Sequence, residues 1–303
     1  MDAPRIEIVR LDGAGVRDPR FVIDGGRWRL RYGGLENFDA TPYEVSTQDY
    51  AQYDGAYLMG ERSGTQDRTI MAVGLGDIAA LRAEAERFFI PRREYEVHVV
   101  AEGRERYFTG RQYALSLAVD NARGAQLLDW TVLALDPWFM GEDEHRFDIA
   151  EARGRRGFPF LSFTAPAAAG EHPGHIGGYI VGTLEKTVRL ENGGDSTAYP
   201  RFDISATGEV VNPSISVVDA SGAVVSHVGF ELTMQAGDSL VVDFSTRPTS
   251  VELNGENALN LTTPDSTLSA GIDVGEFSLT WDADSGDAAL HILPSIRERY
   301  STI

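Results

Sequence analysis

The sequence contains no cysteine among its 303 residues. This absence excludes disulfide bonds, thiolate zinc sites and cysteine nucleophiles. Long apolar runs are also missing, because no segment approaches the ~20 consecutive apolar residues that a membrane-spanning helix needs. The N-terminal residues Met-Asp-Ala-Pro-Arg-Ile-Glu include no basic region followed by an apolar stretch. We therefore expect no membrane insertion, and a protein that folds in the cytoplasm.

Lysine is scarce, and acidic side chains outnumber basic ones by 46 to 27. Lysine occurs once, at Lys186, and the net charge is −19. The excess is uneven, because residues 161–303 carry six basic and nineteen acidic side chains. Such a surface repels a polyanion, so we expect no direct binding of nucleic acid through phosphate neutralisation.

One catalytic signature occurs. Gly237-Asp238-Ser239-Leu240 spells the motif of the GDSL hydrolases, whose serine needs a histidine base oriented by a carboxylate. The nearest candidate, Asp287-Ala-Ala-Leu-His291, is one residue longer than the Asp-x-x-His pattern of that family. The motif also lies late in a run of strands, not at the start of an α/β fold. We interpret Gly237-Asp238 as a turn and predict that the protein is not an enzyme.

Metal and nucleotide motifs are similarly incomplete. His172 and His175 flank a Pro-Gly turn, and Asp143-Glu144-His145 is the other candidate cluster. A transition-metal site needs three or four converging ligands, and neither cluster has a further ligand beside it. No glycine-rich phosphate loop stands between a strand and a helix. The sequence thus predicts no metal and no cofactor, and favours a binding or structural protein.

Residues 187–257 carry the strongest structural pattern. Short apolar runs alternate with turn signals, and Phe230, Leu232 and Met234 alternate with polar neighbours. This period of two is typical of antiparallel strands with one buried face. It predicts a β-sandwich in the second half of the chain.

The first half reads as an antiparallel β domain with one short helix. The pattern in residues 27–32 places Trp28, Leu30 and Tyr32 on one face of a strand. A helix is expected over 77–89, with Asp77 as N-cap and Pro91 as the stop signal. Further strands are expected at 95–100, 105–107, 112–119 and 126–135. Pro137 cannot donate to a strand ladder, so the last strand ends there, and we expect Trp138 and Phe139 to pack between domains.

Four regions follow from these patterns. We expect an N-terminal β domain at 1–139, a linker or protruding loop at 140–178, a β-sandwich at 179–293 and a tail at 294–303 that returns to the first domain. The loop assignment rests on its turn-rich, aperiodic composition.

Fifteen residues keep a recognisable order along most of the chain. They are Arg68, Asp136, Pro137, Trp138, Phe139, Tyr199, Pro200, Gly208, Asn212, Pro213, Gly237, Asp238, Asp243, Asn254 and Gly255. This order resembles that of the siphophage distal tail (Dit) protein family. Two departures are Leu268-Ser-Ala-Gly271-Ile-Asp273, in place of a late Leu-x-x-Gly-x-Asn, and Arg247-Pro248 before the strand at Val251.

The resemblance implies a structural virion protein at the distal end of a phage tail, assembled in the host cytoplasm. It implies a hexameric ring made by the N-terminal domain, and a galectin-like C-terminal sandwich. The implied partners are other copies of the chain, the tail tube protein, the tape measure and the tail-tip hub proteins, with DNA passing through the lumen without being bound.

A second hypothesis is a carbohydrate-binding sandwich that recognises a host surface glycan. Aromatic platforms bind sugars, and the candidates are Trp281, Tyr179, Tyr199 and Phe230. A fold alone licenses little about function, so this alternative depends on where these rings lie.

Overall fold

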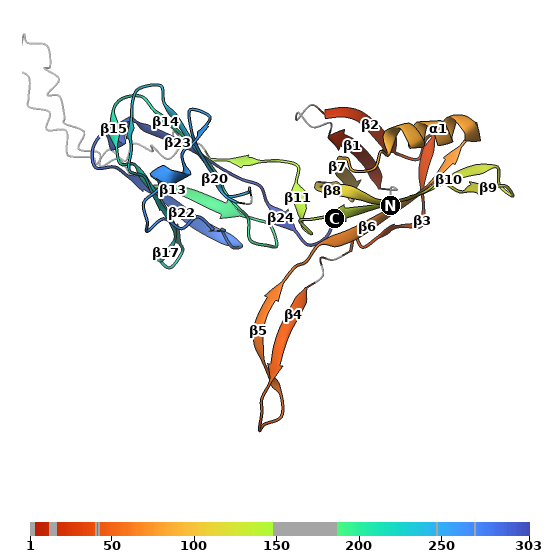
Figure 1. Ribbon diagram of the computed structural model, residues 1–303, viewed down its shortest axis with the longest axis horizontal. Coiled ribbons are helices and arrows are strands. Elements are labelled where there is room, and N and C mark those ends of the chain that lie inside the picture. Colours follow the sequence, from red (N-terminus) through yellow and green to blue (C-terminus); the bar gives the residue numbers. More distant parts are fainter. Residues whose placement is uncertain are drawn as a thin grey trace, which may run out of the picture. The chain divides into compact units, whose positions relative to one another are not determined.

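The computed structural model describes residues 4–11, 17–39, 41, 43–147, 187–246, 248–269 and 271–303 (Figure 1). The chain divides into two compact units. Unit 1 comprises Met1–Glu144, Gly193–Ala198 and Arg297–Ile303, and unit 2 comprises His145–Asn192 and Tyr199–Ile296. Both consist almost wholly of antiparallel strands, which confirms the mainly β prediction. The part of the predicted 140–178 loop from residue 148 onward lies outside the described residues.

Unit 1 is built on one large sheet with the strand order β2-β1-β7-β8-β10-β6-β3. Its elements are β1 (Arg5–Leu11), β2 (Arg17–Ile23), β3 (Trp28–Glu36), β4 (Glu44–Asp49), β5 (Ala56–Arg62), β6 (Gln66–Leu75), α1 (Ile78–Phe88), β7 (Glu94–Ala101), β8 (Arg104–Ser116), β9 (Val119–Asp120), β10 (Ala125–Ala134), β11 (Phe139–Gly141) and β24 (Arg299–Tyr300). The edge strands β2 and β3 are consecutive in the sequence. The short turn at 24–27 therefore joins the two ends of the sheet, and Phe21 and Trp28 pack together with ring centroids 5.3 Å apart.

Helix α1 covers this core. The Asp77 carboxylate accepts hydrogen bonds from the N–H groups of Ala79 and Ala80 at 3.0 and 3.3 Å, which caps the first turn. Leu81, Ala85 and Phe88 are buried at i, i+4 and i+7. The helix contacts β2, β6 and β10, so its apolar face closes the core of unit 1.

Two expected strands of unit 1 differ in detail. Trp28 is buried, but Tyr32 is fully exposed, because the pairing with β6 shifts between Leu30 and Leu35. Gly33 lies within this shifted segment and has φ +64°, a left-handed conformation that favours glycine. The separate strands expected at 105–107 and 112–119 are instead the single long strand β8, followed by the short β9.

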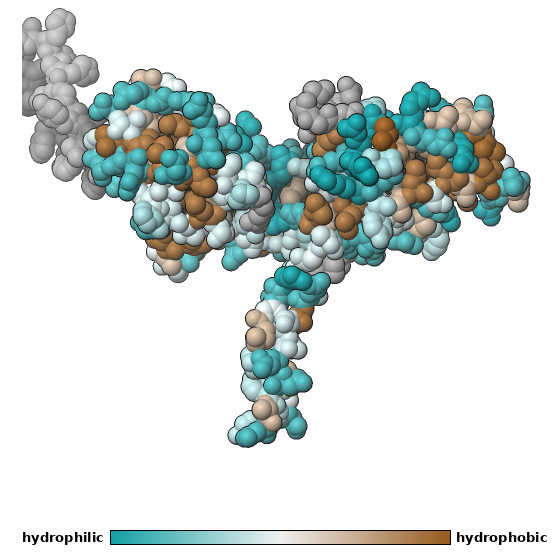
Figure 2. All heavy atoms as spheres, viewed as in Figure 1, coloured by the Kyte–Doolittle hydropathy of each residue, from teal (hydrophilic) through white to brown (hydrophobic). Residues whose placement is uncertain are grey.

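Strands β4 and β5 form a separate two-stranded hairpin. Every residue from Tyr43 to Arg62 is exposed, and Figure 2 shows its surface as a mixture of hydrophilic and hydrophobic side chains. Internal contacts are few: Tyr50 stacks near Tyr57 with centroids 5.7 Å apart, and Arg62 pairs with Glu44 at 2.8 Å. A two-stranded hairpin with no buried face is marginally stable alone in water.

Unit 2 contains a six-stranded sheet, β12-β23-β14-β19-β20-β21, and a four-stranded sheet, β13-β22-β16-β17. Its elements are β12 (His145–Arg146), β13 (Thr187–Asn192), β14 (Arg201–Ala206), β15 (Val210–Val211), β16 (Ser214–Asp219), β17 (Val224–Gly229), β18 (Thr233–Met234), β19 (Ser239–Asp243), β20 (Ser250–Leu253), β21 (Glu256–Asn257), the 3-10 turns Leu259–Leu261 and Asp287–Ala289, β22 (Gly275–Asp282) and β23 (Leu290–Ile296). Alternate residues are buried along β13, β14 and β16, as expected of a sandwich.

Within the described residues, no helix is both long enough and apolar enough to cross a membrane.

Candidate functional site

The predicted residues of unit 1 gather around Arg68 on β6. Arg68 shares the buried face of the strand with Gln66 and Ile70, and it is 0% exposed. Its guanidinium carbon lies 3.9 Å from the ring centroid of Phe139 and 4.4 Å from that of Phe108. Aromatic faces attract a cation, so these rings supply part of what the buried guanidinium loses in leaving water. Phe139 therefore packs inside the core of unit 1, and not between domains as expected from the sequence.

Two backbone carbonyl groups and the side-chain oxygen of Gln66, at 3.4 Å from Nη2, accept hydrogen bonds from Arg68. Arg68 donates from Nη2 to the carbonyl oxygen of Pro137 and from Nε to that of Asn37 at 3.3 Å. Burial lowers the pKa of Arg68 to about 10, although the negative charge of Asp136 opposes this shift. The guanidinium is still charged at neutral pH. Arg68 thus ties the turn at Pro137 to the end of β3.

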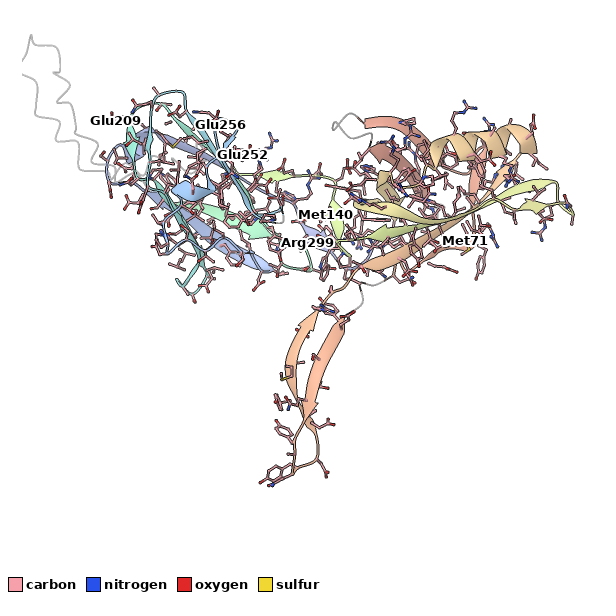
Figure 3. The ribbon with its side chains drawn as sticks, in the orientation of Figure 1. Met71, Met140, Glu209, Glu252, Glu256 and Arg299 are labelled. Atoms are coloured by element: carbon pink, nitrogen blue, oxygen red, sulfur yellow. The ribbon has the colours of Figure 1, made fainter. Side chains whose placement is uncertain are left out.

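The neighbouring Asp136 holds the C-terminal residues of the chain. Both of its carboxylate oxygens lie 2.5 Å from Nη2 of Arg299, and its Oδ1 accepts from the N–H of Trp138 at 3.2 Å. Arg299 is 8% exposed and lies over the ring of Trp138, 5.6 Å from the centroid. Figure 3 labels Arg299 and Met140, which pair between β24 and β11. Asp136, Pro137, Trp138 and Phe139 thus connect two arginines from distant parts of the sequence.

The predicted residues of unit 2 lie mainly in turns. Asp238 accepts from the N–H of Gln235 at 2.7 Å and from Nδ2 of Asn254 at 3.0 Å. Oδ1 of Asn254 accepts from the N–H of Ser239 at 2.9 Å. Asn254 and Gly255 have φ of 54° and 81°, so this turn needs the residue types that tolerate a left-handed backbone. The side chains of Asp238 and Asn254 thus fix the pairing of β19 with β20.

The other predicted residues of unit 2 hold backbone corners. Asn212, with φ 50°, donates from Nδ2 to Asp284 at 2.7 Å. The carbonyl oxygens of Pro200 and Pro213 accept from the N–H groups of Phe244 and Phe230 at 3.1 and 3.0 Å. The remaining positions are the half-buried Tyr199, Gly208 opposite Ala289, Gly237 with φ 97°, and Asp243, which pairs with Arg201 at 3.3 Å. These groups support strand connections and converge on no common point.

The turn at Asp238 predicts a specific acid sensitivity. The hydrogen bond from Gln235, followed by that from Asn254, holds the pKa of Asp238 below its usual value of 3.8. A carboxylate of this kind stabilises the fold above its unfolded pKa, and this stabilisation is lost as the pH falls through the folded value. When the pH is lowered below about 4, we expect the thermal midpoint of unit 2 to decrease. The decrease should be smaller in Asp238→Asn, which has no carboxylate to protonate at this position. Thermal unfolding followed by circular dichroism at several pH values measures the midpoint, with Glu252→Gln, at an exposed position, as the control. An equal decrease of the midpoint in Asp238→Asn and in the unchanged chain would contradict the prediction.

The hydrolase motif does not form a nucleophile and base pair. Ser239 pairs with Ser205, which in turn pairs with His291, so a whole strand separates Ser239 from His291. Two strand spacings amount to about 9–10 Å, well beyond hydrogen-bond reach. Gly237 and Asp238 form the turn before β19, as the sequence indicates.

Burial removes one of the four rings named for a sugar platform. Phe230 is 1% exposed and cannot stack on a ligand, while Tyr179 lies outside the described residues. Trp281 and Tyr199 are half-buried.

The metal-like clusters chosen from the sequence are not the groups that converge. His172 and His175 lie outside the described residues. Among the described residues, His98, Glu105 and Glu142 each offer a ligand atom within 4.8 Å of the others, whereas Asp143, Glu144 and His145 do not form such a group. Sequence reasoning missed this cluster because its members come from β7, β8 and the turn after β11.

Part of the sequence matches a known protein family, and the fold of the chain matches solved structures. Residues 193–300 match the siphovirus-type tail component, C-terminal domain. The crystal structure of the Dit protein of phage SPP1, described as a paradigm of the hub adsorption apparatus in phages infecting Gram-positive bacteria, matches with a TM-score of 0.64 and 13% identity over 97% of this chain and 98% of that chain. The baseplate of phage P2 in its activated conformation, with Ca or with Sr, matches with a TM-score of 0.57 and 10% identity over 99% of this chain and 100% of that chain. No curated protein sequence matches this chain.

Residues 193–300 are therefore similar to the C-terminal domain of siphovirus-type tail components, and this match supports a structural protein of a phage tail. The chain shares its fold with the Dit protein of phage SPP1.

Proposed function

We propose that this chain forms the ring at the distal end of the tail, where it joins the tail tube to the tail tip and the adsorption apparatus. The match of residues 193–300 to the siphovirus-type tail component supports the location, and the likeness of fold to the Dit protein of phage SPP1 over 97% of the chain supports the role. In this proposal unit 1 forms the ring, and unit 2 is a galectin-like sandwich that extends outward. The tail tube, tape measure and tail-tip hub proteins are the proposed neighbours.

The single observation that carries the ring proposal is the exposure of the β4–β5 hairpin. Tyr43, Val45, Leu58 and Met59 are each 57–59% exposed, and Tyr53 is 79% exposed. A hairpin with so many exposed apolar side chains gains stability when a neighbouring surface covers them. A head-to-tail contact of this kind, repeated by a rotation that closes on itself, builds a ring.

The acidic composition is consistent with a lumen through which DNA passes. A surface with net charge −19 gives a polyanion no favourable contact on average, so passage needs no release from bound phosphates.

Immunogold labelling of intact virions tests the proposed location. Antibodies raised against the purified chain should label the distal end of the tail, beside the tip. Label distributed along the tube or confined to the head would contradict the proposal.

A further inference from the structure

The β7–β8 hairpin of unit 1 brings together an imidazole and a carboxylate on one face. His98 on β7 is opposite Tyr107 on β8, and Val100 is opposite Glu105. Because side chains alternate across a strand, His98 and Glu105 project from the same face. Glu142, in the turn after β11, reaches the same place: its Oε2 lies 3.0 Å from Nδ1 of His98. The ligand atoms of His98, Glu105 and Glu142 all lie within 4.8 Å of one another.

Surrounding groups fix the orientation of the imidazole. His98 is 8% exposed, and its Nε2 lies 2.8 Å from Oε1 of Glu96, which is also 8% exposed. The ring of Tyr107 stacks on His98, with centroids 5.3 Å apart at 25°. Nδ1 lies within hydrogen-bond distance of Glu142, so a metal ion would replace the proton on Nδ1 while the proton on Nε2 stays donated to Glu96. A carboxylate behind a histidine is the usual support of a metal-binding imidazole.

The position of Glu142 is also supported. Arg297 donates to the carbonyl oxygens of Gly141 and Glu142 at 3.3 and 3.4 Å and lies over Tyr107, 5.3 Å from the ring centroid. Strand β11 pairs with β8 through Gly141 and Arg106, so the turn begins beside the hairpin. Glu105 and Glu142 both approach Nδ1 of His98, so both carboxylates would attract a cation at this point.

We propose that His98, Glu105 and Glu142 bind a divalent transition-metal ion, with Zn²⁺ as the best fit. One imidazole nitrogen and two carboxylate oxygens provide three protein ligands, and water completes the coordination. The nitrogen donor favours zinc over magnesium and calcium, which prefer oxygen alone. The ion would hold the turn after β11 against the β7–β8 hairpin. Glu142 lies two residues before Glu144, where this segment of unit 1 ends.

Calorimetric titration of the full chain with ZnCl₂, MgCl₂ and CaCl₂ tests the site. Because His172 and His175 can bind zinc elsewhere, the reference protein carries His172→Ala and His175→Ala. We expect one Zn²⁺ per chain and a higher thermal midpoint with zinc. Glu105→Gln and Glu142→Gln should each weaken zinc binding at least tenfold, as loss of a ligand or its support does.

Glu102→Gln is the matched control, because Glu102 is an exposed carboxylate in the turn of the same hairpin and lies outside the cluster. It should bind zinc as the reference does. Both tested carboxylates are exposed, so their amide variants should fold. Absence of saturable zinc binding, equal affinity in Glu105→Gln and Glu102→Gln, or equal binding of Mg²⁺ and Zn²⁺ would each overturn the proposal.

Discussion

Phe139→Ala should lower the free energy of unfolding of unit 1 by about 3–5 kcal/mol. Phe139 is 0% exposed and contacts the rings of Phe38 and Phe108 with centroids 6.0 and 5.6 Å away. Its removal leaves a cavity and also takes from Arg68 the aromatic face closest to the guanidinium. The cost therefore combines lost apolar burial with a buried cation that is less well compensated.

Chemical denaturation followed by tryptophan fluorescence measures this effect. Trp28, Trp130 and Trp138 lie in unit 1 and Trp281 in unit 2, so the signal reports mainly on the mutated unit. Leu135→Ala is the matched control, because Leu135 is a neighbouring apolar residue that is 62% exposed. It should change the free energy by no more than about 0.5 kcal/mol. Equal effects of the two substitutions would show that Phe139 is not part of the core.

Removal of the β4–β5 hairpin should abolish assembly and leave the fold of unit 1 intact. Glu44 and Arg62 pair in register at its base, so a short Gly-Ser turn can replace the residues between them. Because every residue from Tyr43 to Arg62 is exposed, the deletion removes no buried core side chain. We expect an unchanged circular dichroism spectrum and, in light scattering, a particle with the mass of one shortened chain, slightly below the 33.1 kDa of the full chain.

Point substitutions in the same hairpin test the contact without a deletion. Leu58 and Met59 are each 59% exposed. If a neighbour buries them, Leu58→Ser with Met59→Ser should weaken assembly at least tenfold, because each buried apolar side chain contributes about 1.5–3 kcal/mol. Thr47→Ser, in the opposite strand, should assemble normally. Normal assembly of the chain without the hairpin would exclude it from the interface.

Sequence signals that act within a few residues correctly predicted helix ends, strands and turns. Asp77 and Pro91 mark the ends of α1, and the alternation in residues 187–257 marks strands of unit 2. The Asn254-Gly255 pair marks a turn because both residues adopt a left-handed backbone. In each case the cause lies within a few residues of the effect.

Features created by tertiary pairing were missed. Strand β4, Glu-Val-Ser-Thr-Gln-Asp, has no buried face and therefore no apolar alternation to recognise. Arg299 meets Asp136 across more than half of the chain, and Glu142 meets His98 across two strands. Tyr32 keeps the period of its neighbours in sequence, but the shift at Gly33 exposes it. Such contacts depend on register, which a single sequence does not reveal.

We propose that this chain assembles into a ring through unit 1. Electron microscopy of the purified chain in negative stain tests this proposal most directly. We expect closed rings with a central opening in the unchanged chain, and single particles without openings when the β4–β5 hairpin is removed. A chain that remains monomeric at high concentration, alone and with its tail tube protein, would contradict it.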